Sequence, residues 1–125
     1  MRRTSDTINV ALTDRLGAVR PFYTIKGSEA DVAKALESDP DLQELLLEAV
    51  GPIRRSFGGE PRLELMAQWT DEDILLRAAI QLPTTFAGAT GALDEFDRTW
   101  WLGNCGRSGA ALVFDYELRD AVRLA

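Results

Sequence analysis

The 125-residue sequence contains no histidine and a single cysteine, Cys105. Without histidine, the chain lacks the commonest general base and the commonest transition-metal ligand of proteins. Ser-His-Asp and Cys-His catalysis are therefore excluded, and so is a Cys/His zinc site. One cysteine cannot form a disulfide within the chain, which is typical of a reducing compartment. We expect no cofactor and no metal site.

Long hydrophobic runs and an excess of basic residues are also missing. No segment approaches the ~18 apolar residues of a membrane-spanning helix, and no apolar stretch of the kind found in signal peptides follows the basic residues 1–3. The formal net charge is −6, from 20 acidic and 14 basic residues. That balance argues against a nucleic-acid partner, because neutralising phosphates needs a basic surface. These features predict a cytoplasmic protein, and we expect the local basic cluster Arg54, Arg55 and Arg62 to be solvated.

The length and composition are those of one globular domain. Ile8, Val10 and Leu12 alternate with polar or small residues and predict a short strand, and a turn is expected over residues 14–17. Residues 19–25 include β-branched and aromatic residues but also Pro21, so any strand there is an edge strand or an irregular one. Residues 1–26 are interpreted either as a hairpin of the domain or as an arm that contacts a neighbouring subunit.

Two helices are predicted next. A capping pattern at Ser28 places the first over about residues 29–37. Asp39 provides the cap of the second, in which apolar residues recur at spacings of three and four over residues 40–57. Pro52 lies inside this pattern and predicts a kink or a split.

The second half of the sequence predicts a ββαβ unit. Residues 63–69 and 74–82 alternate apolar and polar side chains around a short acidic turn, as in a β-hairpin. A helix capped by Thr84 or Thr85 is expected to end at Gly103. A closing strand over 112–118 should then lie parallel to the 74–82 strand. The apolar seam of the helix is formed by Phe86, Ala89, Leu93, Phe96 and Trp100.

The predicted fold is α+β: an antiparallel hairpin plus a β-α-β crossover, with helices on one sheet face, preceded by an N-terminal β segment and two helices. The polar side of the strands is rich in small or apolar residues. We expect the N-terminal segment or a second subunit to cover that face, and we favour a homo-oligomer. The residues concerned are Met66, Leu75, Ala79 and Val113.

Residues 95–109 gather two adjacent tryptophans, the cysteine and three glycines. Trp101 lies above Asp97 and Asp94 at the edge of the apolar seam, where it either covers the end of the sheet or anchors a partner protein. The glycine-rich loop follows a helix C-terminus, whose dipole is negative, so we interpret it as a turn and not a phosphate site. Cys105 is interpreted as incidental, because no histidine can activate it.

The motif Phe96-Asp97-Arg98-Thr99-Trp100-Trp101-Leu102 is distinctive. Together with its flanking hairpin and strand, the segment 63–118 resembles a group of short, uncharacterised bacterial proteins whose helix ends in Phe-Asp-x-x-Trp-Trp-Leu. The resemblance implies a small companion of another gene product and a partner-binding role. It assigns no functional residue and does not extend to residues 1–60.

Two functions remain open. The favoured one is a non-catalytic protein-interaction or regulatory module, such as an antitoxin-like or companion subunit, because catalytic residue types are missing and the surface is acidic. The alternative is a small enzyme or small-molecule-binding protein that uses carboxylates and arginines in a cleft. A deep pocket lined by Arg77, Arg107 or Asp115 together with Tyr116 would favour the alternative.

Overall fold

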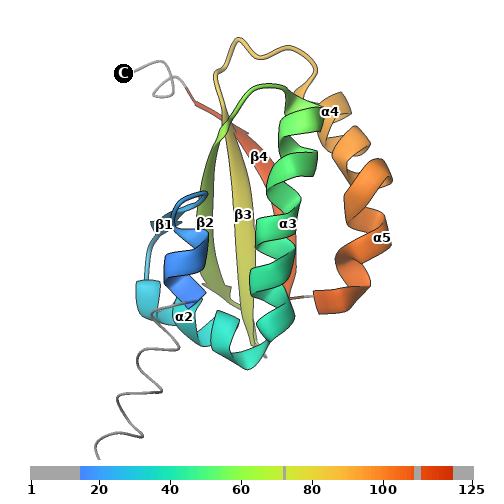
Figure 1. The fold of residues 1–125 in the computed structure, drawn as a ribbon. Helices are drawn as coiled ribbons and strands as arrows, with labels where there is room; N and C mark the ends of the chain where they lie inside the picture. Colours follow the sequence, from blue (N-terminus) through green and yellow to red (C-terminus); the bar gives the residue numbers. More distant parts are fainter. Residues whose placement is uncertain (1–14, 72, 109–110, 120–125) are drawn as a thin grey trace, which may run out of the picture.

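The computed structural model describes residues 15–71, 73–108 and 111–119, and these residues form a helix-covered β-sheet (Figure 1). The α+β class is therefore confirmed. Helices α2 (Glu29–Ser38) and α3 (Pro40–Phe57) and a later helical segment that begins with α4 (Ala89–Phe96) pack on one face of the sheet. The sheet has the order β1 (Thr24–Lys26), β2 (Arg62–Trp69), β3 (Ile74–Leu82), β4 (Leu112–Leu118).

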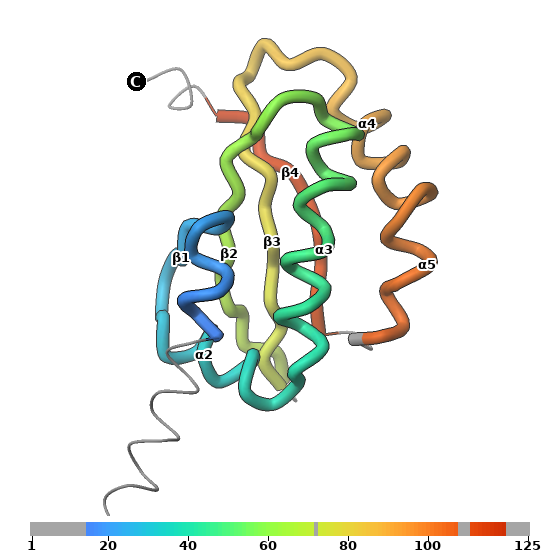
Figure 2. Tube along the Cα trace, in the orientation of Figure 1, coloured from blue at the N-terminus to red at the C-terminus, as the bar shows by residue number. Residues whose placement is uncertain are grey.

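The sheet is mixed. β2 and β3 pair antiparallel, with Arg62 opposite Gln81 and Trp69 opposite Ile74, whereas β1 lies parallel to β2 and β4 parallel to β3. From β3 the chain crosses above the sheet into α4, descends through α5 (Leu102–Asn104) and returns as β4 (Figure 2). A helix-containing connection of this kind is what a parallel pair requires.

The N-terminal caps predicted at Ser28 and Asp39 form, whereas α4 has no side-chain cap and the cap predicted at Thr84 or Thr85 is wrong. Ser28 Oγ accepts a hydrogen bond from the Asp31 N–H at 3.2 Å, and Asp39 Oδ1 accepts one from the Asp41 N–H at 3.1 Å. α3 continues without a break through Pro52, so the predicted split is wrong. A proline removes only one backbone hydrogen bond, and the packing of the buried stripe on both sides of it outweighs that loss.

The beginning of the described chain differs from the prediction. Residues 15–19 are helical where a turn was expected, because Leu16 and Val19 are both buried and lie one helical turn apart. β1 is an edge strand, in agreement with Pro21 before it. The strand predicted around Val10 lies outside the described residues, so the choice between hairpin and arm stays open.

The predicted bounds of the third helix are wrong at both ends. α4 begins at Ala89, after Gly88 at φ 78°, and Phe86 lies before the helix with its ring 6.2 Å from that of Phe57. Gly103 does not end the helix, since α5 and a 3-10 turn (Cys105–Ser108) continue it. Asp97–Trp101 form a π-helical turn between α4 and α5.

Trp69 was expected on the core side of β2 but is 61% exposed. As the last residue of its strand, it reaches past the sheet to α2, where its Nε1 donates to Asp31 Oδ2 at 3.0 Å. The Lys34 ammonium lies 5.6 Å from the centre of its ring, within the range of a cation–π contact. None of the helices in the described part of the chain is long and apolar enough to span a membrane.

Tyr23 ties the segment before β1 to α3. Its hydroxyl donates to the Leu46 carbonyl at 2.7 Å in the buried core, and burial raises the pKa of the phenol above its ordinary value. The side chain therefore stays a neutral hydrogen-bond donor throughout the physiological pH range.

We expect Tyr23→Phe to lower the free energy of unfolding by about 1 kcal/mol, because a buried hydrogen bond is lost. Tyr116→Phe is the matched control, since its hydroxyl meets Thr90 Oγ1 at 2.9 Å in an exposed position, and it should change stability by less than about 0.5 kcal/mol. Urea unfolding at pH 7 measures both. Equal effects would show that the Tyr23 hydrogen bond contributes nothing specific.

Candidate functional site

No described helix covers the second face of the sheet, which we call the bare face. Strand pairing arranges its side chains in rows across β2, β3 and β4, such as Glu64–Ala79–Asp115 and Arg62–Gln81–Glu117. One row is partly apolar, with Met66 and Val113 on either side of Arg77. Val113 is 41% exposed.

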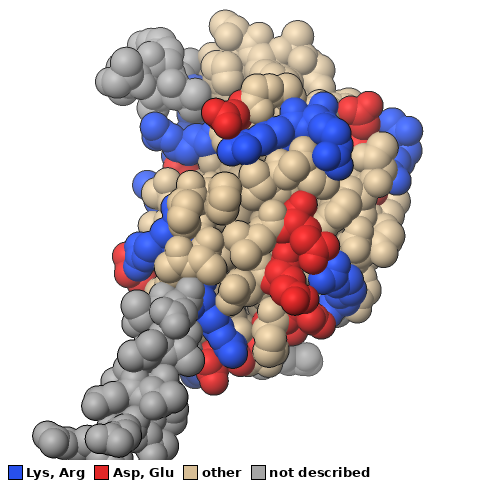
Figure 3. Space-filling view, in the orientation of Figure 1, with Lys and Arg blue, Asp and Glu red and all other residues tan. Residues whose placement is uncertain are grey.

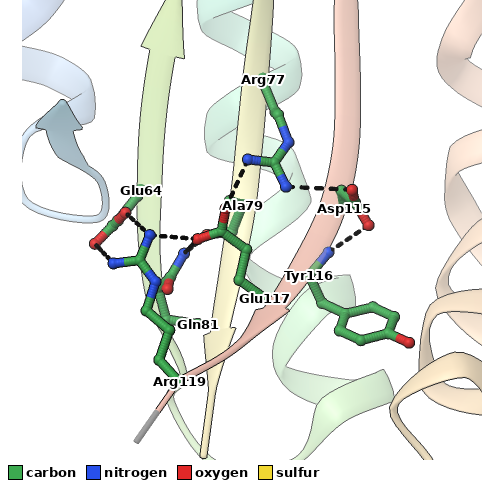
Figure 4. Close-up of polar contacts among 8 residues, drawn as sticks. All are labelled: Glu64, Arg77, Ala79, Gln81, Asp115, Tyr116, Glu117 and Arg119. Atoms are coloured by element: carbon green, nitrogen blue, oxygen red, sulfur yellow. Dashed lines mark hydrogen bonds and ion pairs between the residues drawn. The ribbon is translucent and has the colours of Figure 1, made fainter. Parts of the chain in front are cut away.

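Charged side chains at the centre of the bare face form a connected network (Figure 4). Arg77 donates from Nη1 to Glu117 Oε2 at 2.8 Å and from Nη2 to Asp115 Oδ2 at 3.2 Å. Glu117 also accepts from Gln81 Nε2 at 2.9 Å and from Arg119 Nη2 at 2.5 Å. Arg119 in turn lies 3.4 Å from Glu64 Oε1. Every charge in this group faces one of opposite sign.

The network fixes its own protonation state. The hydrogen bond from Arg77, followed by that from Gln81, lowers the pKa of Glu117 to about 2, against the opposing effect of burial. The Glu117 carboxylate raises the pKa of Arg77 in turn, and Asp115 adds to this. A general base needs a pKa near the working pH, so Glu117 and Arg77 are suited to holding charge and not to moving protons.

Gln81 is the most buried polar residue of the bare face, at 2% exposed. Its amide Nε2 donates a hydrogen bond to Glu117 Oε1, whereas its own Oε1 is buried without a partner among the described residues. An unsatisfied buried acceptor costs roughly 1–3 kcal/mol. The bare face therefore carries one buried acceptor whose cost an ordered water would offset.

The four residues predicted to line a pocket are not brought together. Arg77 and Asp115 meet on the bare face, but Tyr116 points to the helix-covered face because neighbouring strand residues alternate. Arg107 lies at the far end of the helical segment, where it donates to Glu48 at 3.0 Å from both Nη atoms. This contact lowers the pKa of Glu48 and fixes the segment to α3.

Trp101 belongs to an aromatic cluster at the edge of the core. Its ring lies 4.8 Å from that of Phe114 and 5.9 Å from that of Trp100, and Trp100 contacts Phe96 at 5.6 Å. The π-helical turn adds one residue to the helix, so two adjacent tryptophans both reach β4. Trp101 is therefore half-buried, which agrees with its interpretation as cover for the sheet.

The surface beside the aromatic cluster still presents exposed groups. Leu102 is 65% exposed. Asp97 is half-buried, and burial, with the nearby charge of Asp94, raises the pKa of its carboxyl. The predicted partner-binding residues Trp101, Asp97 and Asp94 thus stay a candidate surface, which we call the Trp101 surface.

Sequence reasoning missed a hollow next to the end of α3. It has a volume of about 270 Å³ and is lined by Arg20, Arg54 and Arg62, among others. Figure 3 shows basic side chains in a band across the upper part of the molecule, around this end of α3. The only signal in the sequence was the cluster that includes Arg54 and Arg62, which we had expected to be solvated surface.

Comparisons with protein-family models, curated proteins and solved structures found no match to this chain. The resemblance built on residues 63–118 consequently stays a prediction. Within the described ranges, no three acidic or cysteine side chains are placed to hold a metal ion together.

Trp101→Ala should lower the free energy of unfolding by about 2–3 kcal/mol, because it removes a large ring that packs on Phe114. Leu102→Ala, one residue further on, should cost less than about 0.5 kcal/mol, since its side chain is exposed. Urea unfolding measures the loss of stability in each variant. Similar small losses would instead favour a surface role for Trp101.

Glu117→Gln should lower the free energy of unfolding at pH 7 by about 1–2 kcal/mol, a figure discounted for solvent screening. The folded-state pKa of Glu117 lies near 2, below its ordinary value of 4.5. Its contribution is therefore complete above pH 4.5 and is lost as the pH falls towards 2.

The difference between wild type and Glu117→Gln should accordingly shrink over this pH window, as followed by urea unfolding at several pH values. Glu95→Gln is the control: it makes the same charge change at an exposed residue that forms no ion pair within the described chain. A difference for Glu117→Gln that does not vary with pH would contradict the assigned role.

Proposed function

We propose that this chain is a non-catalytic protein-interaction module, an antitoxin-like or companion subunit, that associates with protein partners through its bare face. The single observation that carries the proposal is the one-sided cover of a mixed sheet. Two of its strand pairs are parallel, and parallel sheets are normally covered on both faces. A partner that packs on the bare face would supply the missing layer.

The chemistry of the bare face also suits docking better than catalysis. Arg77 and Glu117 neutralise each other, and the pKa of Glu117 keeps its charge fixed. Around this network lie half-buried Met66 and Leu75 and exposed Val113. A partly apolar surface with matched charges is typical of non-obligate protein interfaces.

We take a second copy of the chain as the occupant of the bare face. The face carries four cationic and three anionic side chains, a balance of +1, whereas the whole chain carries −6. Two copies that meet through these faces place surfaces of nearly balanced charge in contact and keep the excess negative charge of the chain outside. A twofold arrangement of this kind is the commonest among homo-oligomers. The charged residues are Lys26, Glu64, Arg62, Arg77, Asp115, Glu117 and Arg119.

The proposal predicts a dimer of twice 13.8 kDa in light scattering coupled to size exclusion. Val113→Asp adds a charge to the partly apolar row of the bare face and should give a monomer, with an unchanged circular dichroism spectrum. Leu102→Asp is the matched control, because it places the same charge at an exposed apolar residue on the Trp101 surface. It should leave the dimer intact.

The outcomes separate the two surfaces. A dimer that Leu102→Asp dissociates, and Val113→Asp does not, would assign association to the Trp101 surface and overturn the role of the bare face. A monomeric wild type that retains a stoichiometric host protein, lost in Val113→Asp, would keep the bare face and overturn the second copy as its occupant. A monomer that retains nothing would overturn the proposed function.

A further inference from the structure

The hollow beside the end of α3 brings three guanidinium groups to one small volume. Arg20 comes from the segment before β1, Arg54 from the last turns of α3 and Arg62 from the first residue of β2. The hollow measures about 270 Å³, near the lower end of the roughly 300–1,000 Å³ of ligand pockets. Its size therefore suits a compact ligand.

None of these arginines is held firmly elsewhere. The Arg62 side chain is exposed, and its guanidinium has no hydrogen bond or ion pair with any residue that the structure describes. Arg20 pairs with Glu29 at 2.6 Å and Arg54 with Glu60 at 3.4 Å, but all four side chains are well exposed. Exposed ion pairs contribute only about 0–1 kcal/mol, so an incoming anion can compete for both cations.

The hollow also has apolar residues in its lining. Val50, Ile53 and Leu63 are buried and form part of its lining, and Pro21 and Pro61 contribute to it. Phe22 also lines it and is 42% exposed. A ligand with an apolar body would cover this ring.

We propose that the hollow binds a small organic anion, in which a phosphate or carboxylate group is attached to a compact apolar body. Arginine suits both groups because its planar guanidinium donates two parallel hydrogen bonds to them. The apolar body would pack on Phe22 and the prolines, while Arg54 and Arg62 hold the charge. Glu60, which also lines the hollow, opposes the anion and limits its affinity.

This inference does not depend on the proposed interaction function. Arg62 also lies at one end of the bare face, but Arg20 and Arg54 belong to the hollow alone, and the readout of the test is different. The test is isothermal titration calorimetry of the full chain with phenyl phosphate, benzoate, inorganic phosphate and benzyl alcohol. Phenyl phosphate and benzoate test the two acidic groups. Inorganic phosphate lacks the apolar body, and benzyl alcohol lacks the charge.

We expect phenyl phosphate or benzoate to bind more tightly than both inorganic phosphate and benzyl alcohol. Arg62→Ala and Arg54→Ala should each weaken binding about tenfold, because a charged hydrogen bond is lost. Arg55→Ala is the matched control: Arg55 is the neighbour of Arg54 on α3 but does not line the hollow. It should change the affinity by less than about twofold, and Glu60→Gln should strengthen binding.

The proposal is overturned if neither aromatic anion binds up to about 10 mM, a limit that still detects millimolar dissociation constants. Equal losses for Arg55→Ala and Arg62→Ala would also overturn it, since they would indicate nonspecific attraction to the basic end of α3. If inorganic phosphate bound as tightly as phenyl phosphate, the proposed contact between the apolar body of the ligand and Phe22 would be wrong. Circular dichroism melts of each variant show that a loss of binding is not a loss of fold.

Discussion

The one-sided cover of the sheet is the constraint on which the rest of this structure depends. Leu76, Ala78 and Ile80 of β3 face the helices and belong to the hydrophobic core, so the residues between them must face the other way. This alternation places Arg77, beside buried Ala79 and Gln81, on the bare face. The position of each candidate residue on β3 follows from it.

The same alternation in β4 explains why the bare face carries both apolar and charged side chains. Phe114 enters the aromatic cluster, while its neighbours Val113 and Asp115 face outward. Asp115 and Glu117 are two residues apart on one side of the strand, which lets a single arginine contact both. The ion network is thus a consequence of strand periodicity and of the register between β3 and β4.

The sequence correctly predicted those helix ends and strands that depend on interactions between residues close together in the chain. The caps at Ser28 and Asp39 and the alternation on both sides of the 70–73 turn carry their meaning within a few residues. The π-helical turn was not predictable in this way, because it depends on how Trp101 packs against Phe114, thirteen positions later. The burial predicted for Trp69 was wrong for a similar reason. Its exposed position at the end of β2 is determined by a tertiary contact with Asp31 of α2.

The candidate sites show the same limit. Arg77, Asp115 and Tyr116 were grouped by residue type, but Asp115 and Tyr116 are neighbours on β4 and their side chains point to opposite faces of the sheet. The arginine-lined hollow was missed because Arg20 and Arg62 are 42 positions apart and meet only after β1 pairs with β2. Arg54 and Arg55 are neighbours in the sequence, and nothing in the sequence indicated that only Arg54 would line the hollow.

Arg62 connects the two proposed surfaces. It lines the hollow, and as the partner of Gln81 across the β2–β3 ladder it also lies at one end of the bare face. An anion held by Arg62 would cancel one of the four positive charges of that face and shift its balance from +1 towards zero or below. Because coupling between two binding sites is reciprocal, docking on the bare face and anion binding in the hollow would each alter the affinity of the other, with Arg62 as the shared residue.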